Sequence, residues 1–196
     1  MFEAAVIGVS AGGLHALKTI LPALPADFPL PIAIVQHLDA QSDTYLVEYL
    51  NRISAITVKE AEDKEAPLPG TAYLAPAGYH LLIEPDRIFS LSVDEKVNFA
   101  RPCIDLLFES AADAFGPALI GIVLTGANAD GAQGLRAIKR LGGLAIVQNP
   151  KTAEVPFMPK AALEATAVDH VASLEHIALL LQQLGAGEVY GTGTAG

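Results

Sequence analysis

The stretch AAVIGVSAGGLHAL (residues 4–17) contains the change of pattern that decides the fold. Residues 4–9 form a continuous apolar run, which is typical of a strand buried on both faces of a parallel sheet. Ser10 ends this run, two glycines follow, and residues 13–21 then show the apolar spacing of a helix. A buried strand that leads directly into a helix indicates an α/β domain.

The same alternation continues along the chain. Apolar runs predict further strands at 32–36, 56–59, 119–124, 144–148 and 168–171. Amphipathic segments predict helices at 44–52, 102–115, 131–140, 160–165 and 174–184. We therefore expect an α/β fold with a doubly wound, mostly parallel sheet and helices on both faces.

The alternation of predicted strands and helices is interrupted between residues 67 and 100. Three short runs, TAYLAP, YHLLIE and RIFSLS, are separated by Pro, Gly and Asp, which predicts a β-hairpin or a small antiparallel excursion. The chain ends in GAGEVYGTGTAG, whose glycines indicate a flexible tail. The predicted organisation is one domain over residues 1–184 followed by a tail over 185–196.

Composition limits the classes of function. The net charge of −10 and the lack of a basic cluster argue against nucleic acid and anionic membranes as partners. No apolar stretch approaches the roughly 20 residues that a membrane span needs, and the first residues carry Glu3 instead of a basic leader. The single cysteine, Cys103, excludes an internal disulfide and fits the cytoplasm.

Three residues of types that commonly take part in catalysis follow three of the predicted strands. Ser10, His37 and Asp130 come after runs 4–9, 32–36 and 119–124, respectively. Parallel strands place their carboxyl ends at one edge of a sheet, where ligands bind in such folds. A serine, a histidine and an aspartate at one edge have the composition of a nucleophile, a general base and the residue that orients the base.

Each residue also has a structural interpretation, and other kinds of site were weighed. Ser10 and Asp130 precede predicted helices and are compatible with helix caps, and His37 with a polar loop residue. GVSAGG lacks the second glycine of G-x-G-x-x-G, and no Gly-Lys-Ser/Thr follows it, which disfavours dinucleotide and P-loop sites. The five histidines show no ligand spacing, so we expect neither a metal nor a cofactor.

The residues around Ser10 favour the catalytic interpretation. Residues 8–12, GVSAG, fit the nucleophile elbow G-x-S-x-G, in which a tight turn exposes the serine and directs helical N–H groups toward it. The chain order Ser10, His37, Asp130 differs from that of α/β-hydrolases, and the elbow follows the first strand. Triads occur in any chain order, so the chemistry remains possible.

Taken together, these motifs resemble the catalytic domain of the chemotaxis protein-glutamate methylesterases, the CheB family. The resemblance runs from about residue 5 to 181 and rests on VIGVSAGG (6–13), VQHL (35–38), PGTAYLAPAGYHL (69–81), RPCIDLLFES (101–110), LTGANADGAQGL (124–135) and FMP (157–159). It implies hydrolysis of γ-glutamyl methyl esters on the cytoplasmic domain of a chemoreceptor, and in many members deamidation of glutamines. It also implies Ser10 as nucleophile, His37 as base and Asp130 as the aspartate of the triad.

The resemblance also suggests residues for the oxyanion and the substrate. Backbone N–H groups near Ala11 and Gly12, and in the turn formed by Thr125, Gly126 and Ala127, are candidates for an oxyanion hole. Arg101 and Met158 are candidates for positioning the substrate, with loop packing as the alternative, and we expect His80 to be structural.

The sequence departs from the usual family pattern in ways that leave two other functions open. Ala127 and Asn128 stand where the family usually has Met and Gly, and Cys103 replaces the Ser of the RPS motif. The receiver domain of typical members has no counterpart before residue 1, which predicts an uncovered site that is controlled by a separate regulatory protein or by access to the receptor itself. The alternatives are a non-catalytic signalling module of the same fold and an esterase or amidase for small metabolites.

Overall fold

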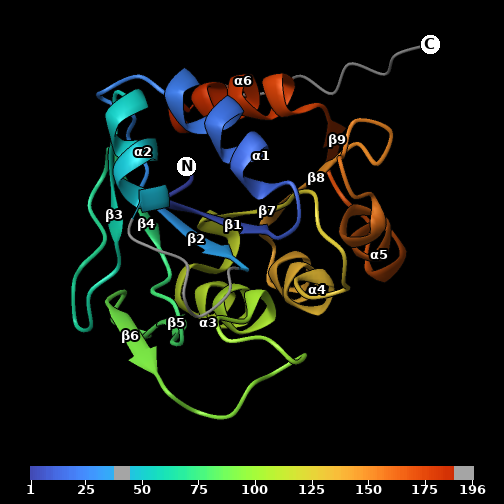
Figure 1. Ribbon diagram of the computed structural model, residues 1–196, viewed down its shortest axis with the longest axis horizontal. Coiled ribbons are helices and arrows are strands. Elements are labelled where there is room, and N and C mark those ends of the chain that lie inside the picture. Colours follow the sequence, from blue (N-terminus) through green and yellow to red (C-terminus); the bar gives the residue numbers. More distant parts are fainter. Residues whose placement is uncertain (38–44, 188–196) are drawn as a thin grey trace.

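A computed structural model of the chain describes residues 1–37 and 45–187 (Figure 1). Within these residues seven strands form one parallel sheet in the order β3-β4-β2-β1-β7-β8-β9. The strands are β1 (Ala4–Val9), β2 (Ile32–Gln36), β3 (Thr57–Glu60), β4 (Thr71–Leu74), β7 (Leu119–Val123), β8 (Leu144–Gln148) and β9 (His170–Ala172). A separate antiparallel hairpin joins β5 (His80–Ile83) to β6 (Phe89–Ser92).

Helices cover both faces of the sheet (Figure 1). One face packs against α1 (Gly13–Ile20), the 3₁₀ turn η1 (Leu21–Ala23), α2 (Tyr45–Ile53) and α6 (Leu174–Gly185). The other packs against α3 (Ile104–Phe115), α4 (Ala132–Arg140), α5 (Phe157–Ala165) and the hairpin, and a second 3₁₀ turn, η2 (Gly116–Ala118), precedes β7.

Strand β1 explains why the strands read as continuous apolar runs. Ala5, Ile7 and Val9 belong to the core beneath α1 and α6, whereas Ala4 and Val6 belong to the core beneath α3. Every residue of β1 is buried, because both faces of the strand are covered. The predicted doubly wound parallel sheet with helices on both faces and a small hairpin is therefore confirmed.

One part of the sequence-based assignment is wrong. TAYL (residues 71–74), expected in the antiparallel excursion, forms β4 and lies between β2 and β3 in the main sheet. Its residues 72–74 are buried, so the strand gains more by entering the covered sheet than by extending an exposed hairpin. Only the second and third short runs form the hairpin.

Smaller differences concern element ends and the tail. Helix α5 begins at Phe157, three residues before the expected start, and β9 begins two residues later than expected. Gly185, where the tail was expected to begin, is the last residue of α6, and its Cα face packs against Phe28. Thr44 and residues 188–196 of the predicted tail lie outside the described part of the chain. No helix in the described residues is long and apolar enough to cross a membrane.

Candidate active site

The loops that leave β1, β2 and β7 meet at the carboxyl edge of the sheet. The backbone N–H of Ser10 donates to the Thr125 carbonyl over 3.0 Å, and the N–H of His37 donates to the Val9 carbonyl over 3.0 Å. These bonds extend the parallel ladder beyond the strand ends. They bring Ser10, His37 and the loop that carries Asp130 to the same edge, as expected from the strand order.

Two glutamines, one at the end of β2 and one at the end of β8, hold this edge together. The amide nitrogen Nε2 of Gln36 donates to the carbonyls of Ser10 (2.9 Å) and His37 (3.0 Å). The Oε1 of Gln148 accepts the N–H of Thr125 over 2.9 Å. Both side chains are buried. Sequence analysis did not assign them a role, although a glutamine that ends a run of buried apolar residues is a usable signal of such a link.

His37 and Asp130 form the closest side-chain contact of the site. Nε2 of His37 lies 2.7 Å from Oδ2 of Asp130. The Asp130 side chain has no exposed surface, whereas the His37 side chain is 13% exposed. The imidazole therefore has one edge in the protein interior and one edge open toward the site.

Asp130 does not cap the helix that follows it. Helix α4 has Gly131 (φ 96°) at its N-cap, with no side-chain cap bond. The Asp130 carboxylate instead accepts the backbone N–H groups of Ile104 (2.7 Å) and Asp105 (3.0 Å) at the start of α3. In return, Oδ1 of Asp105 accepts the N–H groups of Gly131 (2.9 Å) and Gly134 (2.7 Å) at the start of α4. The two helices thus exchange their capping carboxylates, which fixes Asp130 from both sides.

Two further side chains donate to the Asp130 carboxylate. Nδ2 of Asn98 lies 3.1 Å from Oδ1 of Asp130 and 2.9 Å from Oδ2 of Asp105, so it bridges the two carboxylates. Sγ of Cys103 lies 3.1 Å from Oδ1 of Asp130. Asn98 has a positive φ of 53°, in a turn between the hairpin and α3. Sequence analysis missed it, because a lone asparagine in a polar stretch has no pattern that separates it from other loop residues.

These contacts set the charges at the site. Burial alone would raise the pKa of Asp130, but the hydrogen bonds from His37 and from the α3 N–H groups lower it to about 2. Burial raises the pKa of Asp105, and the neighbouring Asp130 charge adds to the effect. Burial, and then the Asp130 charge, raises the pKa of the Cys103 thiol. Asp130 is therefore a stable anion beside the imidazole, and Cys103 stays a protonated donor.

The nucleophile candidate Ser10 is not engaged in capping. The N-cap of α1 is Gly12, without a side-chain cap bond, and the Oγ of Ser10 forms no hydrogen bond with any described residue. Ser10 Oγ and His37 are thus not hydrogen-bonded to each other in this structure. Nδ1 of His37 is instead 3.5 Å from Nδ2 of Asn128. Because Nε2 faces Asp130, Nδ1 is the imidazole nitrogen that this carboxylate does not contact.

The candidate oxyanion donors differ in their availability. Within residues 1–37 and 45–187, the backbone N–H groups of Ala11, Gly12 and Ala127 donate to no protein acceptor. The N–H of Gly126 donates to the Val155 carbonyl over 3.0 Å, so it is not available for a substrate.

Thr125 links the loops behind these donors. Its Oγ1 donates to the Ala11 carbonyl over 2.8 Å and accepts the N–H of Val155 over 2.9 Å. The residue itself is buried. Thr125 therefore connects the Ser10 turn with the loop before α5, and its contacts point to a role in holding these loops.

The remaining candidates also hold the loops in place. Met158 is 1% exposed and packs so closely on Gly126 that a Cβ there would lie 2.4 Å from its Cε. The guanidinium of Arg101 donates to the carbonyls of Val93 (2.7 Å) and Asp94 (2.8 Å) after the hairpin. His80 is fully buried, with its Nε2 3.0 Å from the Glu95 carbonyl, which agrees with a structural residue.

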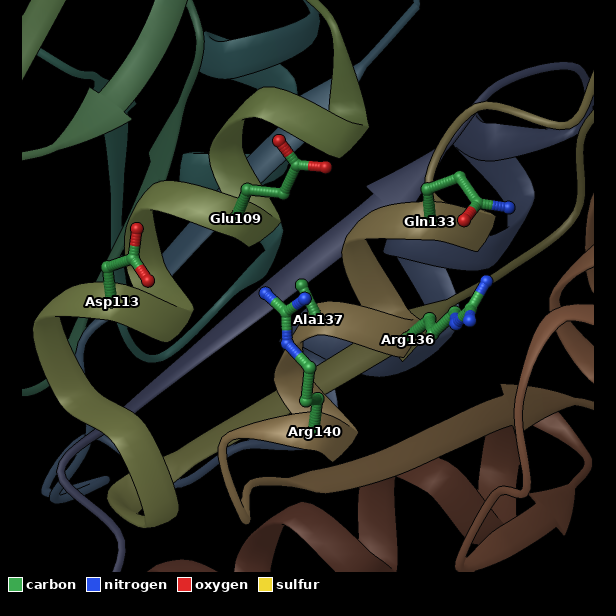
Figure 2. Close-up of a pocket in the computed structure, with 6 residues that line it drawn as sticks. All are labelled: Glu109, Asp113, Gln133, Arg136, Ala137 and Arg140. Carbon is green, nitrogen blue, oxygen red and sulfur yellow. The ribbon is translucent and has the colours of Figure 1, made fainter.

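A charged cavity of about 500 Å³ lies away from these residues, between α3 and α4. Figure 2 shows Glu109 and Asp113 on α3 opposite Arg140 on α4, while Arg136 points away from α3. Burial raises the pKa of Glu109, and the nearby Asp105 and Asp113 add to this shift. None of the residues that line this cavity is among the candidate site residues at the carboxyl edge of the sheet.

Comparison with known proteins decides the family. Residues 5–181 match the CheB methylesterase family. The chain belongs to the CheB methylesterase family. A protein of Leptospira interrogans named putative protein-glutamate methylesterase/protein-glutamine glutaminase is 57% identical over 183 residues, which cover 93% of this chain and 95% of that protein. The crystal structure of the CheB methylesterase catalytic domain of Thermotoga maritima superposes with a TM-score of 0.90 at 36% identity, covering 94% of this chain and 99% of that domain.

Other members of the CheB family are longer than this chain. The protein-glutamate methylesterase/protein-glutamine glutaminase 1 of Carboxydothermus hydrogenoformans is 43% identical over 178 residues. The match covers 88% of this chain but only 52% of that protein.

The three departures from the usual CheB motifs all lie at this edge. Ala127 is exposed, and its N–H donates to no described acceptor, so the smaller side chain leaves the backbone group in place. Cys103 provides a donor to Asp130, as a serine hydroxyl at that position could. Asn128 is half-buried and contacts the Asp130 backbone N–H and Nδ1 of His37, and a glycine at this position would lack both contacts.

Proposed function

We propose that this CheB-family chain hydrolyses γ-glutamyl methyl esters on the cytoplasmic domain of a methylated chemoreceptor, releasing methanol and leaving glutamate. The observation that carries the proposal is the 2.7 Å contact between His37 and the buried, ionised Asp130, beside the Ser10 turn. The names of relatives at 57% and 43% identity support this substrate class. They also name a glutaminase, so deamidation of receptor glutamines by the same residues is a second activity of the proposed site.

Acylation begins with Ser10. Its hydroxyl oxygen attacks the ester carbonyl while Nδ1 of His37 accepts the hydroxyl proton. The Asp130 carboxylate accepts the Nε2–H of the imidazolium and stabilises its charge. The carbonyl electron pair moves onto the oxygen, where the N–H groups of Ala11 and Ala127 are the donors we assign to it.

The next steps release methanol and glutamate. The tetrahedral intermediate collapses, the C–OCH₃ bond breaks, and Nδ1–H of His37 protonates the departing methoxide. A water molecule then attacks the acyl-enzyme ester, and its proton passes to the same nitrogen. The Ser10 oxygen leaves with that proton, so the enzyme returns to its starting state and one water has been consumed.

The site is suited to a protein substrate in the cytoplasm. The exposed Ala11 and Ala127 lie at the open edge of the sheet, where a receptor side chain can approach. Methylated glutamates of a chemoreceptor lie on its cytoplasmic domain, so we assign the protein to the cytoplasm, with a separate regulatory protein as a further partner. The acidic net charge favours partners with basic surfaces.

The test is methanol release from methylated receptor by the purified chain. Ser10→Ala removes the nucleophile and is expected to abolish release. Ser173→Ala is the matched control, because the Ser173 hydroxyl also lies beside a histidine, 3.2 Å from Nδ1 of His176, but caps α6 on another part of the molecule. The control is expected to retain full activity.

The alternatives give different results in the same assay. A chain that releases no methanol from receptor but hydrolyses small methyl esters is a metabolite esterase. A chain inactive on both, whose Ser10 also fails to react with an organophosphorus probe, is a binding module, and either result would overturn the proposal.

A further inference from the structure

Asn128 connects the aspartate loop to the base of the site. Its Oδ1 accepts the backbone N–H of Asp130 over 3.1 Å, which forms a local turn across two residues. Its Nδ2 is 3.5 Å from Nδ1 of His37. One side chain thus contacts both residues of the closest pair in the site.

The first contact fixes which end of the amide faces His37. A backbone N–H can only donate, so the atom that receives it from Asp130 must be the Asn128 oxygen. The NH₂ group therefore points to the imidazole, and Nδ1 of His37 must offer a lone pair to it. The proton of neutral His37 then lies on Nε2, which donates it to Asp130.

The contact with His37 is long and therefore weak. At 3.5 Å it is well beyond the usual 2.9–3.0 Å of an N–H···O or N–H···N bond, so a serine hydroxyl can replace it at little cost. The Asp130 contact on the other side, at 2.7 Å, is short. Asn128 thus adds to the orientation and tautomer of the imidazole that the Asp130 contact favours, and it does not block Nδ1.

We propose that Asn128 is a positioning residue of the esterase: its amide holds His37 with an unprotonated Nδ1 ready to accept the Ser10 proton. The proposal rests on the proposed function. It assigns a role to a position where the usual family motif has no side chain, so this chain has added a contact on the base. The amide is suited to the role because it is neutral and, toward His37, only donates.

The charges around His37 explain why a neutral donor is needed. Among the described residues, Asp130 is the only charged group in contact with the imidazole. Asp105 is linked to Asp130 through Asn98 and adds further negative charge behind it. Cys103 donates to Asp130 as a thiol. A second carboxylate, placed at Nδ1, would favour protonation of both imidazole nitrogens and remove the base.

Asn128→Asp is the decisive variant. Aspartate keeps the oxygen that accepts the Asp130 N–H, so the local turn is preserved, but it replaces the NH₂ group with an acceptor. An Asn128 that only formed the local turn would keep that turn as aspartate. Asn149→Asp is the matched control, because Oδ1 of Asn149 accepts the N–H of Lys151 over 3.0 Å in the same i to i+2 turn, outside the site.

The first measurement needs no catalytic activity. In Ser10→Ala protein labelled with ¹⁵N-histidine, the His37 signals are assigned by their loss in Ser10→Ala/His37→Gln. At pH 7 we expect His37 to carry a proton on Nε2 only, both in the Ser10→Ala parent and in the parent with Asn149→Asp added. With Asn128→Asp added instead, we expect both imidazole nitrogens to be protonated. An Asn128→Asp spectrum identical to that of the parent, or the same change in Asn149→Asp, would overturn the proposal.

The second measurement is the pH profile of methanol release. We expect Asn128→Asp to lower kcat/KM at pH 7 severalfold, with most of the loss recovered toward pH 9, because a carboxylate beside Nδ1 favours the protonated imidazole. An unchanged profile overturns the proposal. If the parent chain releases no methanol but the tautomer result holds, the proposed function has failed and the assignment of Asn128 stands.

Discussion

Asp130 and Asp105 are two buried carboxylates in nearly matching surroundings, yet their pKa values move in opposite directions. Each accepts two backbone N–H groups at the start of the other's helix, and Asn98 donates to both. The pKa of Asp130 is lowered to about 2, while that of Asp105 is raised by burial. Backbone capping alone therefore does not decide the charge of a buried carboxylate here.

The difference comes from side-chain donors. Asp130 also receives Nε2–H from His37 and the Cys103 thiol, which lower its pKa together with the backbone N–H groups of α3. Among the described residues Asp105 receives a side-chain hydrogen bond only from Asn98, and the nearby Asp130 charge adds to the rise in its pKa. Asp130 is thus suited to stabilise an imidazolium, whereas Asp105 joins two helices.

The largest expected effect is on turnover. Asp130→Asn keeps the size of the side chain but presents an amide that cannot stabilise the imidazolium, so we expect kcat for methanol release to fall about 10⁴-fold, as in other triads. Asp105→Asn should lower kcat less than tenfold, because Asp105 does not contact His37. Equal losses in the two variants would remove the distinction between the two carboxylates.

The second effect is on stability. Asp105→Ala leaves the N–H groups of Gly131 and Gly134 buried without an acceptor, which we expect to cost about 3 kcal/mol of the free energy of unfolding. Asp113→Ala, an exposed position on the same helix, should change it by no more than about 0.5 kcal/mol. Urea unfolding measures the free energy of unfolding of both variants. A loss below about 1 kcal/mol for Asp105→Ala would contradict the exchange of capping carboxylates between α3 and α4.

The third effect is on the pH dependence of stability. The pKa of Asp130 falls from an ordinary 3.8 to about 2 on folding, so its contribution is complete above pH 4 and is lost as the pH falls through 2. The shift corresponds to about 2 kcal/mol. The raised pKa of Asp105 has the opposite sign, since the folded state then holds a proton more tightly and loses stability as the pH rises.

The two variants should therefore change acid unfolding in opposite directions. Asp130→Asn should flatten the loss of stability between pH 4 and 2, whereas Asp105→Asn should remove a gain in stability that the parent shows as the pH falls toward 4. The midpoint of urea unfolding at each pH gives the slope. A steeper acid limb for Asp130→Asn would mean that its carboxylate is not held as an anion in the folded state.

Much of the fold followed from the sequence because the strands are buried on both faces. Their continuous apolar runs located β1, β2 and β8 to the residue. The assignment failed at β4, since a four-residue run gives no sign of which neighbours it will pair with. Pairing of short strands depends on the burial that the whole sheet offers, which local pattern does not contain.

The site was predictable only in part, for a related reason. Ser10 and His37 could be placed at one edge because each directly follows a strand, and Asp130 because it lies in the loop after β7. The exchange of capping carboxylates between α3 and α4 could not be predicted, because Asp130 reaches the start of a helix 26 residues earlier in the chain. The bridging amide of Asn98 depends on that same long-range packing.

The smallest expected effect concerns Cys103, the weakest of the donors that distinguish Asp130 from Asp105. Its thiol lies 3.1 Å from Oδ1 of Asp130, is buried, and has a raised pKa, so it remains protonated. Cys103→Ser keeps a donor in nearly the same volume, and we expect kcat to change less than about threefold. Cys103→Ala removes the donor, but His37, Asn98 and two N–H groups still hold the carboxylate, so the loss in kcat should stay below about tenfold. The methanol assay ranks the two variants. A loss in Cys103→Ser as large as that in Asp130→Asn would mean that the thiol, and not the imidazole contact, sets the Asp130 carboxylate apart from that of Asp105.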